Sequence, residues 1–222
     1  MTKKTLIIWL AFMLVVSGLL SPGLYAIEKR PGGFEQSHFV GGRAGAWALN
    51  GNDAFIDSLE DFSSSALYVE FFYAHRLAPI SSLELSIGLF SQGDMKYNSD
   101  QGIIVGAVKI YPIFLSGKIY PLSAVQSMSF LPYLRLGGGI VYGTRDISTV
   151  YYNDPANYYV EESQTKFTYL WGAGIDWPIA DQIGLNVDFK YTPAKFGKPL
   201  AGLEDYSGWT LTFGVGYILK PR

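Results

Sequence analysis

The chain of 222 residues contains no cysteine, only two histidines, and Lys and Arg in scattered positions. Without cysteine, disulfides, thiolate metal sites and a lipid anchor on an N-terminal cysteine are all excluded. Two histidines are too few to build a catalytic set at a surface. A net charge of −2 without a basic stripe argues against binding to nucleic acid. We therefore expect no enzyme, no cofactor, no defined metal site and no nucleic-acid partner.

Apolar residues make up 49% of the chain and aromatic residues 16%, which excludes a disordered protein. One apolar run, Leu6–Val16, follows two lysines and is too short to span a bilayer as a helix. A small residue, Ala26, follows at the distance expected of a cleavage site. We expect residues 1–26 to be a secretory signal peptide and residues 27–222 to form one domain.

After residue 26 no apolar run is long enough for a membrane-spanning helix; apolar and polar residues alternate instead. In the last segment one side carries Trp209, Leu211, Phe213, Val215, Tyr217 and Leu219, opposite threonines and glycines. The same period of two recurs near residues 67–76, 83–89, 104–110, 134–142, 167–177 and 183–192, and weakly near 38–49. About eight such segments predict an all-β protein, an antiparallel up-and-down barrel. In the weak first segment Phe39 and Trp47 share the side of Arg43, so its register stays open.

The composition of the polar side of these segments indicates whether the apolar side faces a barrel interior or lipid. A water-soluble barrel alternates too, with its apolar side inside and a surface rich in Lys and Glu. Here the polar side is mostly Gly, Ser and Thr with about one charge per segment, and aromatic residues gather toward the ends of the apolar side. This pattern favours a transmembrane barrel with a polar lumen.

The alternation directs one set of charged side chains into the lumen. The set is Arg43, Glu70, Glu84, Lys109, Arg135, Asp176, Asp188 and Lys190. Its positive and negative members are equal in number, and opposite charges that are hydrogen-bonded to one another are tolerated in a narrow interior. The set is consistent with a structural plug and with a polar path whose ion pairs rearrange.

The connections between segments differ in length. Residues 75–80 and 178–182 are short and predict periplasmic turns, whereas 50–64, 91–102, 143–164 and 193–207 are long and predict surface loops. The connection at 115–129 fits neither class.

Two of the long connections suggest binding surfaces. Phe55, Ile56, Leu59 and Phe62 alternate with acidic residues at helical spacing, which predicts a short amphipathic lid over the barrel mouth. Tyr151, Tyr152, Tyr158 and Tyr159 lie near Asp154, Glu161 and Glu162, a composition that suits contact with protein or glycan, or weak binding of a divalent cation.

The end of the chain carries a family signature. Thr212, Gly214, Tyr217 and Leu219 resemble the signal that the outer-membrane assembly machinery reads, although that signal usually ends the chain on Phe. The chain thus resembles the eight-stranded outer-membrane barrels, the group of the OmpA transmembrane domain, OmpX and the OmpW family. Residues 171–176 and 185–191 are similar to strands six and seven of OmpW.

The resemblance implies a place in the outer membrane of a Gram-negative-type bacterium, in contact with its lipid and its assembly machinery, most simply as a monomer. Likeness to OmpW implies a narrow conduit for small hydrophobic molecules. The alternative is a non-conducting structural or surface-recognition barrel whose acidic, Tyr-rich loops bind partners. Both histidines, His38 and His75, fall at the expected periplasmic rim, away from the surface loops.

Overall fold

The computed structural model describes residues 38–50, 65–99, 102–123, 130–151, 157–200 and 203–219. The expected signal peptide and the expected lid residues Phe55, Ile56, Leu59 and Phe62 lie outside these ranges. The strands are β1 (His38–Leu49), β2 (Ser65–Ala78), β3 (Ser81–Ser99), β4 (Gly102–Ile119), β5 (Leu131–Tyr151), β6 (Asn157–Pro178), β7 (Ile183–Thr192), β8 (Lys195–Leu200), β9 (Leu203–Asp205) and β10 (Gly208–Leu219).

Eight of these strands close into one barrel, in the order β1-β10-β7-β6-β5-β4-β3-β2. Every neighbouring pair is antiparallel, and β1 closes the ring on β10 from His38↔Leu219 to Leu49↔Gly208. β8 and β9 form a separate hairpin inserted between β7 and β10. The predicted fold class, an all-β antiparallel up-and-down barrel of about eight strands, is confirmed.

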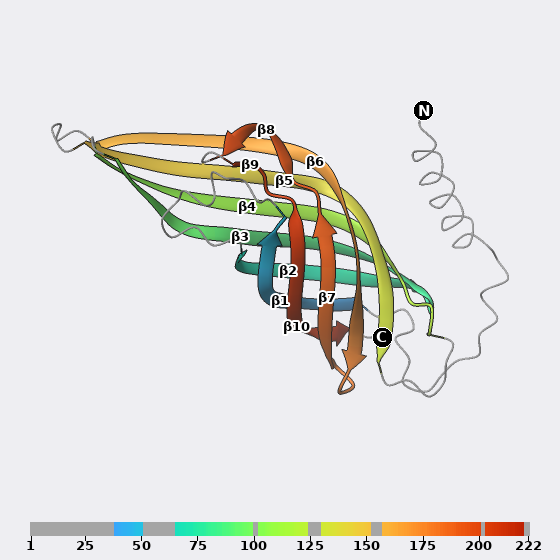
Figure 1. Ribbon diagram of the computed structural model, residues 1–222. Helices are drawn as coiled ribbons and strands as arrows, with labels where there is room; N and C mark the ends of the chain where they lie inside the picture. The colour runs from blue at the N-terminus through green and yellow to red at the C-terminus, as the bar shows by residue number, and fades with distance from the viewer. Residues whose placement is uncertain are drawn as a thin grey trace, which may run out of the picture.

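The strands are strongly unequal in length. β1, β7 and β10 have 10 to 12 residues, whereas β3 to β6 have 18 to 22 and sweep far beyond the barrel as a projecting sheet (Figure 1). The prediction of surface loops at 91–102 and 143–164 is therefore wrong. Pairing simply continues, for example at Ser99↔Gly102 and Asp146↔Glu161. A strand that has left the membrane needs no apolar face, so its sequence loses the alternation that identifies it.

The two ends of the barrel differ, and we name them by their connections. At the turn end, β2 and β3 are joined through residues 79–80, and β6 and β7 through 179–182. At the loop end stand the projecting sheet and the β8–β9 hairpin. The unassigned connection at 115–129 is in part strand, since β4 runs to Ile119 at the turn end.

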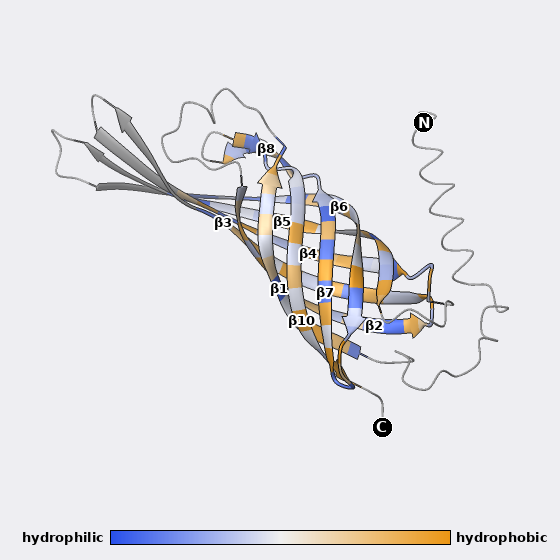
Figure 2. Ribbon diagram, turned by 60° about the horizontal axis from the view of Figure 1, so that its bottom comes forward, coloured by the Kyte–Doolittle hydropathy of each residue, from blue (hydrophilic) through white to orange (hydrophobic). Residues whose placement is uncertain are grey.

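The outer wall of the barrel is apolar. Alternate residues point outward, and among them Phe167 is 82% exposed, Phe71 73% and Phe213 62%. Figure 2 shows such residues as orange bands around the wall. An exposed apolar belt of this extent suits lipid rather than water. Among the described residues, no helix has the length and hydropathy needed to cross a bilayer.

Aromatic rings gather on the wall toward the loop end. The Trp209 ring lies 4.8 Å from that of Phe189 and 5.0 Å from those of Trp171 and Tyr191. Rings that are apolar with a polar edge are typical of the membrane interface. The cluster therefore indicates the upper limit of the lipid-facing belt.

Candidate functional site in the barrel lumen

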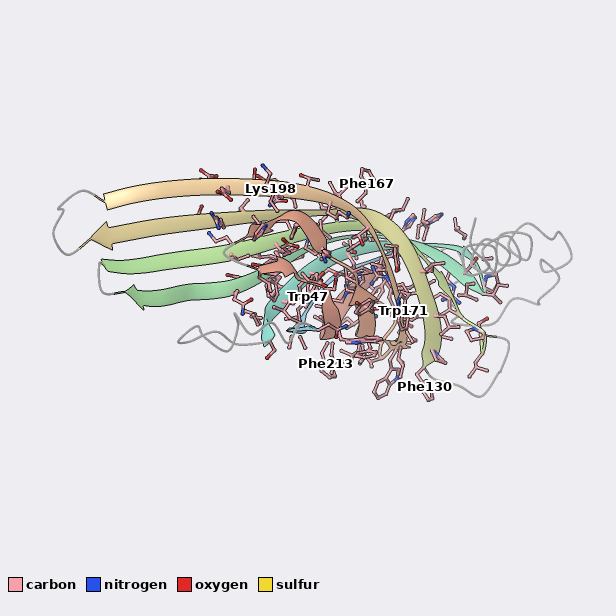
Figure 3. All side chains as sticks on the ribbon, turned by 45° about the horizontal axis from the view of Figure 1, so that its top comes forward. Trp47, Phe130, Phe167, Trp171, Lys198 and Phe213 are labelled. Carbon is pink, nitrogen blue, oxygen red and sulfur yellow. The ribbon has the colours of Figure 1, made fainter. Side chains whose placement is uncertain are left out.

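The interior of the barrel is arranged in three layers. Phe39, Phe72, Ala74 and Ile218 form a small apolar layer near the turn end. A charged layer follows in the middle, and a larger apolar layer fills the loop end. Phe39 and Trp47 both point inward with Arg43, which settles the register of the first strand. Figure 3 places Trp47 within the ring of strands and Phe213 on its outside.

The charged layer brings together seven of the eight side chains expected in the lumen. They are Arg43, Glu70, Glu84, Arg135, Asp176, Asp188 and Lys190. Arg43 Nε donates to Glu70 Oε1 at 2.8 Å, and Lys190 Nζ pairs with the other carboxylate oxygen. The phenol of Tyr68 donates to that same oxygen.

Glu84 is the hub of this layer. Its Oε1 lies 2.5 Å from Arg43 Nη2 and 2.9 Å from Arg135 Nη2, while its Oε2 lies 2.7 Å from Lys118 Nζ. All four side chains are fully buried. A carboxylate with three cationic partners compensates much of the cost of removing these charges from water.

The two aspartates complete the layer. Asp188 accepts from Arg135 Nη1 at 3.2 Å and from the Tyr133 hydroxyl at 2.7 Å. Asp176 accepts from Asn186 Nδ2 at 2.6 Å and pairs with Lys118 Nζ at 3.3 Å. Both carboxylates thus accept hydrogen bonds from buried polar side chains.

Lys109 does not belong to the charged layer. It lies on the outer side of β4, 44% exposed, and its Nζ is 3.9 Å from Asp146 Oδ2. Lys118, further along the same strand, supplies the fourth cation instead. The prediction failed because Val108 and Ile110, taken as lipid-facing, point into an interior that is apolar at this height.

Four cations and four anions therefore form one neutral layer. The cations are Arg43, Lys118, Arg135 and Lys190, and the anions are Glu70, Glu84, Asp176 and Asp188. None of their side chains is more than 4% exposed. The ion pairs of this layer are thus buried within the lumen.

Glycine at one position of β10 lets the layer pack. A Cβ at Gly214 would stand 2.6 Å from the Cβ of Arg43 and 2.7 Å from the carbonyl of Gly42. Gly214 belongs to the expected insertion signature, together with inward Thr212 and outward Tyr217 and Leu219. That stretch therefore also has a packing role in the lumen.

The apolar layer at the loop end is completed by the β8–β9 hairpin. From the barrel strands come Trp47, Tyr68, Phe90, Val108, Ile110, Phe114, Val141 and Leu170; from the insertion come Ala194, Phe196, Leu200, Leu203 and Tyr206. Gly143 on β5 makes room, since a Cβ there would lie 2.6 Å from Leu200 and 2.9 Å from Phe196. The described residues of the connection at 193–207 thus fold back over the loop end of the barrel, and we call this segment the stopper.

Polar bonds attach this stopper to β6. Gln164 Nε2 donates to the Lys198 carbonyl at 2.6 Å, and the Lys198 amide donates back to Gln164 Oε1 at 3.1 Å. The Thr168 hydroxyl donates to the Pro193 carbonyl. Figure 3 shows Lys198 beside the projecting sheet.

Within the stopper, the Tyr206 hydroxyl donates to the Leu200 carbonyl at 2.6 Å, and burial raises the pKa of Tyr206 above its usual range. This hairpin could not be predicted from local pattern, because its apolar residues have no regular spacing. The tyrosines expected in a surface loop stand partly in strands, Tyr151 in β5 and Tyr158 and Tyr159 in β6. Tyr152 and Asp154 lie outside the described residues.

The chain matches known proteins among the solved structures. No family model and no curated protein matches the chain. Ail, the attachment invasion locus protein of Yersinia pestis, matches with a TM-score of 0.51 and 16% identity, over 83% of this chain and 98% of Ail. Ail in complex with the heparin analogue sucrose octasulfate matches with a TM-score of 0.52, 15% identity and the same coverage. The chain has the fold of an eight-stranded outer-membrane barrel.

The outer membrane protein OprG from Pseudomonas aeruginosa matches with a TM-score of 0.49 and 14% identity, over 84% of this chain and 97% of OprG. The matches with Ail confirm the expected resemblance to eight-stranded outer-membrane barrels at the level of the fold. The finer likeness to OmpW in strands six and seven stays a prediction.

Proposed function

We propose that this chain is a non-conducting barrel of the outer membrane of a Gram-negative-type bacterium, and that its projecting sheet and loop end bind partners outside the cell. The observation that carries the proposal is the closed lumen. A neutral, fully buried ion-pair layer is backed by an apolar layer and a docked hairpin. Moving a solute through would require breaking ion pairs in a dry interior, which is costly.

The outer wall supports placement in lipid. The exposed apolar belt and the ring cluster around Trp209 suit a bilayer and its interface. Tyr217 and Leu219 point outward on β10, where the assembly machinery would meet the expected insertion signature. The turn end then faces the periplasm and the projecting sheet faces the exterior.

The long strands support a recognition role. A strand of about 9 to 11 residues is enough to cross a bilayer. β3 to β6 have 18 to 22 residues and extend far past the apolar belt. A barrel of the same fold, Ail, is named for attachment and has been solved with a heparin analogue. That precedent supports attachment as the class of function here, without indicating the partner.

Conductance across planar bilayers tests the proposal. The mature chain without a tag should insert, shift in unheated electrophoresis as a folded barrel, and carry no ionic current. It should also leave the uptake of small alkanes into vesicles at the level of protein-free vesicles. Stable current steps or added uptake would favour the narrow conduit for small hydrophobic molecules instead.

A shortened variant tests the recognition role. Residues 147–160 are replaced by an Asn-Gly turn, which joins Asp146 to Glu161, two residues already paired across β5 and β6. The barrel should fold unchanged, while attachment of producing cells to surfaces coated with glycans or serum proteins should fall to the level of cells lacking the protein. Normal attachment of cells that produce this shortened variant would count against the recognition role.

A further inference from the structure

The two histidines of the chain meet at the turn end. The sequence contains two histidines, His38 and His75, and they are direct partners in the register of β1 and β2. Their ring centroids are 4.7 Å apart, with 22° between the ring planes. Both lie on the outward side, His38 with Val40 and His75 with Tyr73.

The hydrogen bonding of the two rings leaves ligand nitrogens available. His38 Nδ1 lies 2.6 Å from the Tyr73 hydroxyl. In the tautomer with the proton on Nδ1, that nitrogen donates to the phenol oxygen and Nε2 keeps a free lone pair. His75 Nδ1 is buried and has no hydrogen-bond partner in the described part of the chain.

This arrangement matches the way histidine binds metals. Neutral imidazole is a preferred ligand of zinc, copper and nickel ions, and a ligating ring usually donates its other N–H to an oxygen. Metal–nitrogen distances of about 2.0–2.1 Å would require the two rings to rotate out of this stacked arrangement, so that one nitrogen of each ring points at the ion.

We propose that His38 and His75 bind a divalent transition-metal cation at the periplasmic rim, with Tyr73 positioning the His38 ring. No group of three or more His, Cys, Asp or Glu side chains suited to a metal occurs in the described ranges. In the proposed site, water completes the coordination. The ion would bridge β1 and β2, the first hairpin of the barrel.

The structural alternative is a plain aromatic contact at the membrane edge, since Leu83 and Leu219 are the register partners on the other sides of the pair. A metal measurement separates the two. The mature chain is made without a histidine tag, labelled with 15N-histidine and placed in nanodiscs, so that the spectrum contains the ring signals of two residues only. Zn²⁺ is the probe, with calorimetry in parallel.

The metal site predicts one Zn²⁺ per chain and a shift of nitrogen signals in both rings. His38→Gln and His75→Gln should each weaken binding about 100-fold while the barrel still shifts in electrophoresis, since one of two ligands is lost. Tyr73→Phe should weaken it about tenfold. Tyr217→Phe, an outward tyrosine near the same end, should leave it unchanged.

Several results would overturn the site. One is zinc binding of equal strength in the double variant His38→Gln, His75→Gln, which would place the ion on carboxylates. Another is a shift confined to one ring, and a third is no binding below about 1 mM, the affinity of a very weak site. Equal affinity in Tyr73→Phe would remove the positioning role of that phenol.

Discussion

The middle and the loop end of the lumen fill the same narrow barrel with opposite chemistry. The charged layer uses side chains of the barrel strands alone, each anion facing more than one donor. The apolar layer is incomplete without the inserted hairpin, whose Phe196, Leu200 and Leu203 supply much of its packing. The first is built by the barrel strands themselves, whereas the second depends on an inserted segment with its own two-stranded sheet.

The difference shows where strength and mobility reside. Breaking a buried ion-pair layer leaves an unpaired charge in a dry interior, which is costly, and it affects every barrel strand except β10, which supplies no charged member. Releasing the hairpin loses apolar contacts and the bonds between Gln164 and Lys198, but the eight-stranded ladder survives. We expect the charged layer to control global unfolding and the hairpin to open locally.

The largest effect is expected from Glu84→Gln. The substitution keeps the shape but leaves four cations facing three anions, and it should lower the free energy of unfolding by about 3–5 kcal/mol. The matched control is Glu162→Gln. Glu162 is 44% exposed and lies 2.9 Å from Arg145, so its loss should cost less than about 1 kcal/mol. Urea unfolding of the barrel in vesicles, followed by tryptophan fluorescence, measures both.

Equal losses in the two variants would mean that burial does not distinguish these ion pairs. Adding Lys118→Met to Glu84→Gln restores three charges of each sign. Only part of the lost stability should return, because the layer is neutral again but Asp176 loses its ion pair with Lys118.

A smaller effect on global stability is expected from Leu200→Ala in the hairpin. Truncating this fully buried side chain removes about 2–5 kcal/mol of packing, lost mainly from the docked hairpin. Cleavage by trypsin after Lys195, which precedes Phe196 in β8, should become at least about tenfold faster, while the urea midpoint of the barrel changes little. Leu211→Ala, on the lipid-facing side, is the control and should leave cleavage at Lys195 unchanged. A fall in the urea midpoint as large as that of Glu84→Gln would show that the two layers unfold together.

The same contrast explains what the sequence could predict. Where the interior is polar, alternation separates lipid from lumen, and Glu84, Arg135 and Asp188 were assigned correctly to the inside by that rule. Toward the loop end the interior is apolar, so both sides of β4 are apolar there and the rule placed Lys109 inside. Local pattern cannot reveal an interior filled by a distant hairpin.

The long strands were missed for a related reason. In the proposed orientation the projecting parts of β3 to β6 lie outside the membrane, where nothing demands a period of two in the sequence. The pairing of His38 with His75 was also beyond local pattern, because it depends on the register between β1 and β2.

The smallest effect concerns the boundary between the two layers, where Thr210 and Thr212 point inward from β10 and are both fully buried. Thr212 faces the charged layer, and its hydroxyl donates to the Asp188 carbonyl at 3.5 Å. Thr210 faces Trp47, and its hydroxyl has no hydrogen-bond partner among the described residues. Valine has the shape of threonine without the hydroxyl, so Thr212→Val should lower the free energy of unfolding by about 0.5–1.5 kcal/mol, whereas Thr210→Val should leave it unchanged or raise it by up to about 1 kcal/mol. Urea unfolding in the same vesicles gives both values. Equal losses of stability in the two variants would mean that the Thr210 hydroxyl also has a hydrogen-bonding partner. The polar layer would then extend to Thr210.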